Sequence, residues 1–172
     1  MPGRCPATAQ SPTSHRSCPY SLTLATMTEL TQTSQTSTDN IRTVEGFLSA
    51  LQDADYEAAN AALDDHLVYQ NVGLPTIRGR SRAMRLFRQM DGRMGFEVKI
   101  HRAAADGAAV LTERTDALIL GPLRIQFWVC GVFEVHDGRI TLWRDYFDFY
   151  DMTKALLRGV AGAVIPALKA RM

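Results

Sequence analysis

Apolar side chains in the first third of the chain recur every three or four residues, the period of an α-helix that buries one face. The first such stretch follows Thr38 and Asp39, and either residue can cap a helix with its side-chain oxygen. Its apolar positions are Ile41, Val44, Phe47, Leu48 and Leu51. The pattern predicts an amphipathic helix that packs against the rest of the domain through this face.

Two further helices are predicted before residue 91. Asp55 can cap a short helix over 56–65, and Ser81 can cap another over 82–90. The buried positions of the second of these would be Ala83, Leu86, Phe87 and Met90. Between the two helices, residues 66–72 have the composition of a strand.

Alternation of apolar and polar residues takes over in the second half of the chain and indicates β-strands. The predicted strands span residues 96–105, 108–120, 123–136 and 139–149. The pairs that separate them are Asp106-Gly107, Gly121-Pro122 and Asp137-Gly138, which favour tight turns. A last helical piece is expected over 152–157. Helices followed by an antiparallel meander predict an α+β domain whose curved sheet wraps around the helices.

The ends of the chain differ from its middle in composition. Residues 1–38 hold fifteen Ser and Thr residues and four of the seven prolines, with no apolar periodicity. Such a segment buries too little apolar surface to offset the entropy of ordering, so we expect it to be disordered. The folded domain is expected over 39–158, and residues 159–172 form an apolar tail.

Composition excludes several classes of protein. A net charge of +1 gives no reason to expect nucleic acid as a partner, and no apolar run reaches the length of a membrane span. Three cysteines do not make a disulfide framework, and no signal peptide is visible, so a cytoplasmic protein is expected. The four histidines have no carboxylate or cysteine at metal-ligand spacing, and nucleotide-binding glycine motifs are absent. We therefore expect neither a metal nor a cofactor.

Polar side chains share strand faces with large apolar ones in three separate predicted strands, because alternate residues of a strand point to the same side. The polar residues are Tyr69, Asn71, Arg114, Asp116 and Asp145. Their neighbours on the same faces are Leu67, Val110, Thr112, Leu118, Thr141, Trp143 and Phe147. Taken strand by strand, a structural ion pair or a solvated edge is the better explanation of such residues. The coincidence across three strands favours a common pocket.

If these five residues meet, their chemistry follows from their charges. Two neighbouring carboxylates oppose each other's ionisation, while a guanidinium keeps one of them ionised. Asp116 and Asp145 around Arg114 would then form an acid–base pair in an apolar pocket. Tyr69 and Asn71 would supply neutral hydrogen bonds that hold a water molecule. The reaction indicated is addition of water to a lipophilic compound that needs simultaneous protonation.

At these residues the sequence resembles the limonene-1,2-epoxide hydrolase family. The fragments "VYQN" with "LP", "ERTD", "GVF", "DGRI" and "WRDYFD" occur in that family's order and spacing, between about residues 38 and 158. The resemblance implies a cone-like α+β fold of the nuclear-transport-factor-2 type, with a curved mixed sheet around a deep apolar pocket. It also implies a homodimer that opens epoxides in one step, without metal or covalent intermediate.

The resemblance assigns roles to the matching positions. Asp145 would be the general base that deprotonates the water, which Tyr69 and Asn71 help to position. Asp116 would be the acid that protonates the epoxide oxygen, and Arg114 would bridge the two aspartates. The pocket wall is expected to include Leu118, Phe127, Val129 and Phe147. The substrate stays open between a terpene epoxide and a bulkier fatty-acid or sterol epoxide.

Two other functions suit the same architecture. An isomerase or cyclase would use Asp145 as a base on a carbon acid, and a non-catalytic module would only bind an apolar ligand. Arg114 argues against the first, because a guanidinium lowers the pKa of the base beside it. The ionisable Asp145 argues against the second, because a pocket that only binds apolar ligands gains nothing from a buried charge.

Overall fold

The computed structural model describes residues 19–165 of the chain. The backbone divides into two compact units, Met1–Gln32 and Thr33–Met172, and the sheet and all candidate site residues belong to the second. The elements are α1 (Pro19–Gln52), α2 (Tyr56–Ala62), β1 (Leu63–Asn71), β2 (Ile77–Arg78), α3 (Arg80–Met90), β3 (Gly95–Asp106), β4 (Ala109–Leu120), β5 (Leu123–His136), β6 (Arg139–Tyr146) and α4 (Phe149–Val164). The predicted α+β class is confirmed.

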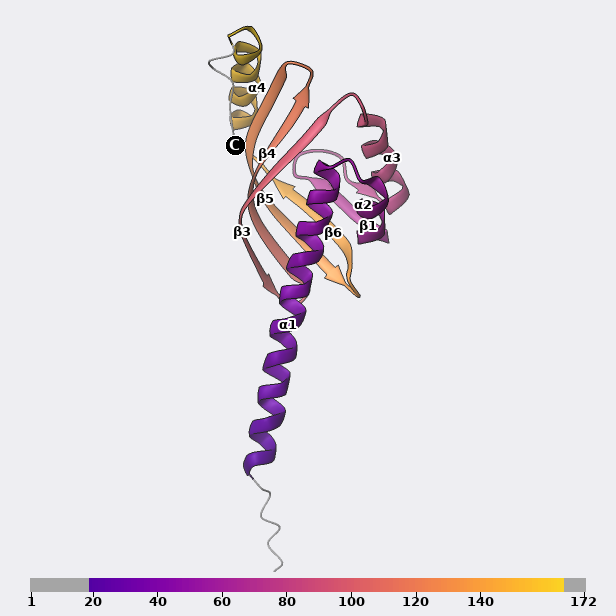
Figure 1. Ribbon diagram of the computed structural model, residues 1–172, viewed down its shortest axis with the longest axis vertical. Helices are drawn as coiled ribbons and strands as arrows, with labels where there is room; N and C mark the ends of the chain where they lie inside the picture. The colour runs from indigo at the N-terminus through magenta and orange to yellow at the C-terminus, as the bar shows by residue number, and fades with distance from the viewer. Residues whose placement is uncertain (1–18, 166–172) are drawn as a thin grey trace, which may run out of the picture. The chain divides into compact units, whose positions relative to one another are not determined.

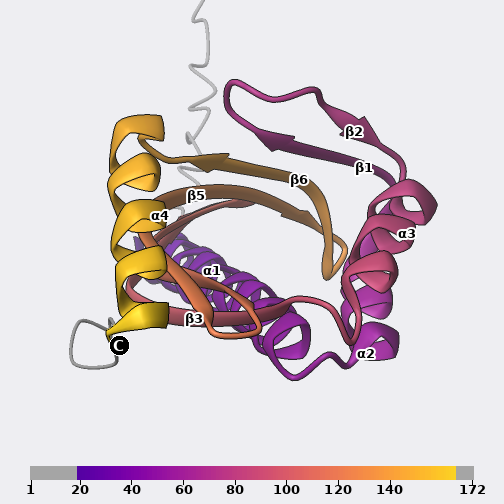
Figure 2. The same ribbon diagram turned by 90° about the horizontal axis from the view of Figure 1, so that it is seen from above.

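The six strands form one mixed sheet in the order β2-β1-β6-β5-β4-β3. Strands β3 to β6 pair as the predicted antiparallel meander, while β1 pairs with β6 in parallel. The strands curve together in one layer, and α2 and α3 lie side by side at its β1 end (Figure 2). Figure 1 shows β6 between β1 and β5, so the first strand of the chain lies beside the last.

The core lies on one face of this sheet. It joins Val44, Phe47 and Leu48 of α1 with Phe87 of α3 and with the inward residues of the strands. Trp143 of β6 stands at its centre. The ring contacts of Trp143 are with Phe47, Tyr69, Phe87 and Phe133. Aromatic contacts of this kind hold α1, α3 and three strands in one arrangement.

The first helix does not begin where the sequence pattern indicated. Helix α1 already runs from Pro19, so the expected helix start at Thr38 or Asp39 is wrong. The disorder expected over 1–38 stays a prediction. The hydroxyl of Thr38 donates to the carbonyl of Ser34 one turn back, 3.0 Å away, and Asp39 accepts from the side chain of Gln35. Both side chains therefore form hydrogen bonds within the helix and do not cap its N-terminus. Residues 1–18 lie outside the described part.

The other helix boundaries confirm the predicted cap of α2. They differ from the predictions at the start of α3 and at the end of α4. Asp55 caps α2, where its side chain accepts from the amide of Ala58. Helix α3 begins at Arg80 after Gly79, not after a Ser81 cap, because Gly79 has φ +90° and its amide donates to the carbonyl of Leu67. Helix α4 runs on to Val164, so the expected tail begins as helix, and residues 166–172 lie outside the described part.

A β-bulge in β6 changes which face of the sheet one residue occupies, and the predicted face of that residue is wrong. The register between β5 and β6 shifts at Glu134/Val135, which pairs Leu142 with Glu134 and Ile140 with Val135. Ile140 is therefore the buried residue, and Thr141 is only half-buried, against the expectation that Thr141 shares the face of Trp143. Alternation resumes after the bulge, because a bulge shifts the side-chain sequence by one residue. No helix in the described range is long and apolar enough to cross a membrane.

Candidate active site

Strand pairing brings the polar residues of β1 and β6 together. In the parallel pair, Tyr69 lies opposite Trp143 and Asn71 opposite Asp145. Residues paired in this way have side chains on the same face of the sheet and within contact distance. The carboxyl group at the end of β6 is therefore next to the amide at the end of β1.

Strand β4 adds a guanidinium and a second carboxylate on the same face. The Nε atom of Arg114 lies 3.0 Å from Oδ1 and 3.1 Å from Oδ2 of Asp116. Its Nη2 atom lies 2.6 Å from Oδ2 of Asp145. The five polar residues named from the sequence thus come together on one sheet face, and Arg114 contacts both carboxylates.

The charged cluster is shielded from solvent. Arg114 is fully buried, and Asp116 and Asp145 are each only 5% exposed. Burial raises the pKa of Asp116 to about 6, against the opposing effect of the Arg114 charge. Burial raises the pKa of Asp145 as well, and Arg114 again opposes it. The pKa of Arg114 rises because the attraction of both carboxylates outweighs its own burial, so it remains a cation.

Tyr69 and Asn71 form a neutral pair beside the carboxylates. Asn71 donates from Nδ2 to the phenol oxygen of Tyr69 over 2.8 Å. Burial, with the charge of Asp145 as a second cause, raises the pKa of Tyr69 above its usual value. The phenol therefore keeps its proton, and its O–H group and the amide oxygen of Asn71 remain available for further hydrogen bonds.

The cluster lies in the wall of a cavity of about 700 Å³. Tyr69, Asn71, Asp116 and Asp145 line it, and so do the four expected wall residues Leu118, Phe127, Val129 and Phe147. Sequence reasoning did not name the residues that the helices and the segment after α3 contribute, among them Gln52, Tyr56 and Met94. They lie far from the motifs, and no spacing in the sequence connects them to the strands.

Two buried polar atoms of the cluster lack a hydrogen-bond partner within the described part of the chain. They are Oδ1 of Asp145 and Nη2 of Arg114, whose ion pair with Asp145 does not have hydrogen-bond geometry. A buried polar atom of this kind is normally satisfied by water or a ligand. Among residues 19–165 there is no cluster of His, Cys, Asp or Glu that could hold a metal ion.

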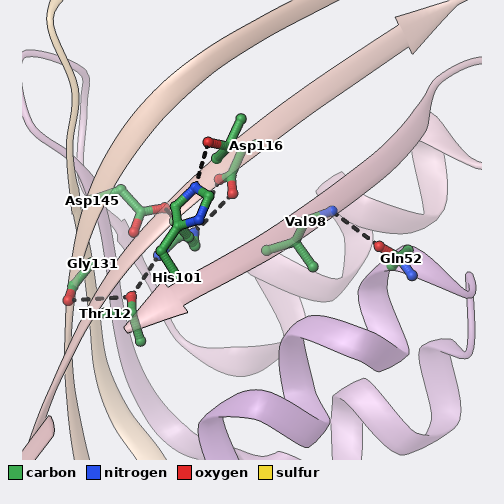
Figure 3. Close-up of polar contacts among 9 residues, drawn as sticks. Gln52, Val98, His101, Thr112, Asp116, Gly131 and Asp145 are labelled. Carbon is green, nitrogen blue, oxygen red and sulfur yellow. Dashed lines mark hydrogen bonds and ion pairs between the residues drawn. The ribbon is translucent and has the colours of Figure 1, made fainter. Parts of the chain in front are cut away.

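Two more residues touch the guanidinium and were given no role from the sequence. Thr112 accepts from Nη1 of Arg114 over 3.2 Å, and Gly131 lies beside both. Figure 3 shows Thr112, Gly131, Asp116 and Asp145 gathered in one region, apart from the contact between Gln52 and the Val98 amide. Strand parity already put Thr112 on the face of Arg114, and that signal could have identified it.

His101 also appears near the cluster in Figure 3 but does not belong to it. Its ring nitrogen contacts the hydroxyl of Thr115 at 2.8 Å, and the side chain is exposed. Thr115 points away from the face that carries Arg114 and Asp116, because it is the residue between them. The charged cluster therefore contains no histidine from this strand pair.

A curved mixed sheet with helices on its inner face, and a charged cluster in an apolar cavity, defines an α+β protein of the NTF2-like class. An NTF2-like protein of unknown function from Burkholderia pseudomallei K96243 superimposes with a TM-score of 0.61 at 16% identity, over 69% of this chain and 97% of that one. This likeness shows the fold alone.

Closer relatives identify the family. The model of the limonene-1,2-epoxide hydrolase catalytic domain matches residues 38–158. Epoxide hydrolase EphG of Mycobacterium tuberculosis (strain ATCC 25618 / H37Rv) is 66% identical over 149 residues, covering 85% of this chain and all of EphG. The structure of an LEH-like epoxide hydrolase from M. tuberculosis gives a TM-score of 0.78 at 68% identity, over 79% of this chain and 97% of that one. The chain belongs to the limonene-1,2-epoxide hydrolase family and is an epoxide hydrolase of that type.

Proposed function

We propose that the protein hydrolyses a lipophilic epoxide to a vicinal diol in one step, without a cofactor. The observation that carries the proposal is the contact of one buried guanidinium with two carboxylates in the wall of a largely apolar cavity. Asp145 acts as the general base, Asp116 as the general acid, and Arg114 holds the two in different protonation states.

The step balances without any further reactant. Asp145 takes a proton from water as the water oxygen forms a bond to one epoxide carbon. The bond between that carbon and the epoxide oxygen breaks, and the oxygen takes the proton of Asp116. The product is a diol, and a proton passes from Asp145 back to Asp116 through solvent before the next turnover. Acid or base assistance of this kind contributes about 10²–10⁴-fold per group.

Three features of the site support these roles. Burial raises the pKa of both carboxyl groups, that of Asp116 to about 6, so the pair can hold one proton near that pH. Oδ1 of Asp145 has no partner among the described side chains and suits a bound water. Asn71 lies opposite Asp145 in the sheet and can orient the same water together with Tyr69.

The lipophilic substrate class is proposed from the cavity. Leu118, Phe127, Val129 and Phe147 line it together with aromatic and methionine side chains, so an apolar substrate gains free energy by leaving water. A volume of about 700 Å³ lies in the range of cavities that enclose most of a small apolar molecule. Terpene, fatty-acid and sterol epoxides are the candidates to compare.

The test is diol formation from a panel of lipophilic epoxides in ¹⁸O-labelled water. Wild type should form a diol that carries label after a single turnover, and Asp145→Asn and Asp116→Asn should each lose about 100-fold or more in kcat. Asp106→Asn, an exposed carboxylate at the end of β3, is the matched control and should retain full activity. Label that enters the diol only in a second turnover would contradict the one-step mechanism.

The homodimer expected from the resemblance is a proposal of its own. Leu111, Trp128 and Tyr146 are 47%, 50% and 41% exposed, and they lie on neighbouring strands on the face opposite the cavity. A second copy of the chain would remove this apolar patch from water. Light scattering should give twice the chain mass for wild type and a lower mass for Trp128→Asp. The expected cytoplasmic location likewise stays a prediction.

A further inference from the structure

The side chain of Arg114 crosses a whole strand to reach its second partner. Arg114 lies on β4 and Asp145 on β6, and β5 lies between them in the sheet. Neighbouring strands are about 4.8 Å apart, so the two backbones are about 10 Å apart. The guanidinium must therefore pass directly over β5 to come within 2.6 Å of Asp145.

The residue of β5 at the crossing point is Gly131. It pairs with Thr112 of β4 on one side and with Asp145 of β6 on the other. A Cβ atom on Gly131 would lie 2.1 Å from Nη1 of Arg114, 2.6 Å from Oγ1 of Thr112 and 2.9 Å from the ring of Phe133. No other residue type leaves room for the guanidinium at this position.

Backbone conformation does not explain this glycine. Gly131 is not among the described residues with positive φ, so any residue could adopt its backbone geometry. A glycine inside a strand weakens the strand, because it packs no side chain and loses more conformational entropy on folding. What Gly131 contributes is the space above β5, which we call the Gly131 gap.

Thr112 holds the guanidinium inside this gap. Its hydroxyl accepts from Nη1 of Arg114 over 3.2 Å and donates to the carbonyl of Gly131 over 3.5 Å. Thr112 is 1% exposed, so water does not compete for these contacts. The ring of Phe133 lies 5.8 Å from the guanidinium carbon and adds a cation–π contact. In this one orientation of the guanidinium, Nε contacts Asp116, Nη1 contacts Thr112 and Nη2 contacts Asp145.

We infer that Gly131 and Thr112 are positioning residues for epoxide hydrolysis: the gap lets Arg114 reach Asp145, and the threonine hydroxyl fixes it between the two aspartates. The inference rests on the proposed function, in which Arg114 keeps the aspartates in different protonation states. A guanidinium pushed out of the gap would leave Asp145 without its cation and the base would hold its proton to a higher pH.

The first test is Gly131→Ala, with Gly46→Ala as control, because a Cβ on Gly46 meets nothing within 4 Å. Displacing a catalytic group by about 1 Å costs about 100-fold, so kcat of Gly131→Ala should fall by about that factor while KM changes little. The acid limb of its pH profile should move to higher pH. Wild-type kcat and an unshifted profile in a folded Gly131→Ala would overturn the inference.

The variants Thr112→Val and Thr112→Ser test the positioning role of the threonine hydroxyl, and they do so even if Gly131→Ala does not fold. Valine keeps the shape but removes the hydroxyl, so kcat should fall about tenfold, which is the loss of one buried hydrogen bond. Serine keeps the hydroxyl and should restore both kcat and the pH profile. Equal activity of the valine variant and wild type, or a serine variant as poor as the valine variant, would contradict the role of the hydroxyl.

The same assay separates this inference from the proposed function. If Asp145→Asn and Asp116→Asn keep wild-type diol formation, the acid–base mechanism fails. If both aspartate variants lose activity but Gly131→Ala and Thr112→Val do not, the mechanism stands and only the positioning roles are wrong.

Discussion

At the scale of single residues, Asp116 and Asp145 differ in surroundings although both contact Arg114. Asp116 receives the Nε hydrogen bond on both oxygens, whereas Asp145 contacts Nη2 through one oxygen and keeps the other free of described partners. Coupled carboxyl groups titrate as a pair, and the guanidinium decides which of them carries the proton. The residue that keeps a free oxygen is the one suited to bind water.

Catalysis should therefore depend on pH in a bell-shaped manner. kcat/KM should be highest where the coupled pair Asp116 and Asp145 holds one proton. It should fall as the pair loses that proton above about pH 6, and fall again at lower pH as the pair takes up a second proton. Initial rates across the pH range, with Asp106→Asn as control, measure both limbs. A rate that rises steadily above pH 6 would contradict the assignment of Asp116 as the acid.

The same pKa shift predicts the pH dependence of stability. The pKa of Asp116 is raised from 3.8 to about 6 in the folded protein, so the folded state binds a proton more strongly than the unfolded chain. Its contribution is fully present below about pH 4 and is lost as pH rises through 6, by about 3 kcal/mol at about 1.4 kcal/mol per pKa unit.

Urea unfolding of wild type and Asp116→Asn at several pH values checks this sign. The difference in unfolding free energy between the two should change in favour of the asparagine variant as pH rises from about 4 to 7, because asparagine carries no charge to bury. A difference that stays constant over this range would show that Asp116 titrates with its usual pKa.

At the scale of elements, α4 packs on β5 through small residues. Ala155, Gly159 and Gly162 form its buried face, and a Cβ on Gly159 would lie 2.5 Å from the carbonyl oxygen of Arg124. The helix can approach the strand closely only because these side chains are small or absent. Asp148 caps its first turn by accepting from the amides of Tyr150 and Asp151.

Two glycine-to-alanine changes in helices should therefore act in opposite directions. Gly46→Ala lies on the exposed face of α1 and should stabilise the protein by about 0.5–1 kcal/mol through helix propensity. Gly159→Ala should destabilise it by about 1–3 kcal/mol because the methyl group meets the backbone of β5. Thermal unfolding of both variants measures the difference, and a stabilised Gly159→Ala would contradict the close packing of α4.

The sequence predicted the elements well where the signal was local. Asp55 caps α2 as its position indicated, and all four strands of the meander occur, although the last ends at Tyr146 and not at residue 149. The sequence did not predict elements whose position depends on a contact with a residue far away in the chain. The amide of Gly79 bonds to Leu67, which moves the start of α3, and the two-residue β2 exists only because β1 pairs with it.

At the scale of the whole molecule, two strands separated in the chain, β4 and β6, hold one charged cluster. Removing only the cation would leave two buried carboxylates facing each other. Arg114→Met should cost about 3–5 kcal/mol of unfolding free energy, as expected for breaking a buried ion pair. Each missing carboxylate should reduce that penalty.

A double-mutant cycle measures this coupling across the sheet. In an Asp116→Asn/Asp145→Asn background, Arg114→Met should cost clearly less than in wild type, because no uncompensated carboxylate remains. Denaturant unfolding of the four proteins provides the coupling free energy. Additive effects would mean that Arg114 and the aspartates do not interact in the folded protein.

The sequence by itself determined the class of fold, the faces of most strands, and all five polar residues that line or join the cluster. Each of these follows from a repeat of two or of 3.6 residues or from a short motif, and such patterns are local. Only the tertiary structure decided that β1 pairs with β6, which residues of the helices line the cavity, and that Gly131 leaves the space through which Arg114 reaches Asp145. The physical reason is that these features depend on the distance between atoms far apart in the chain, and no local periodicity encodes that distance.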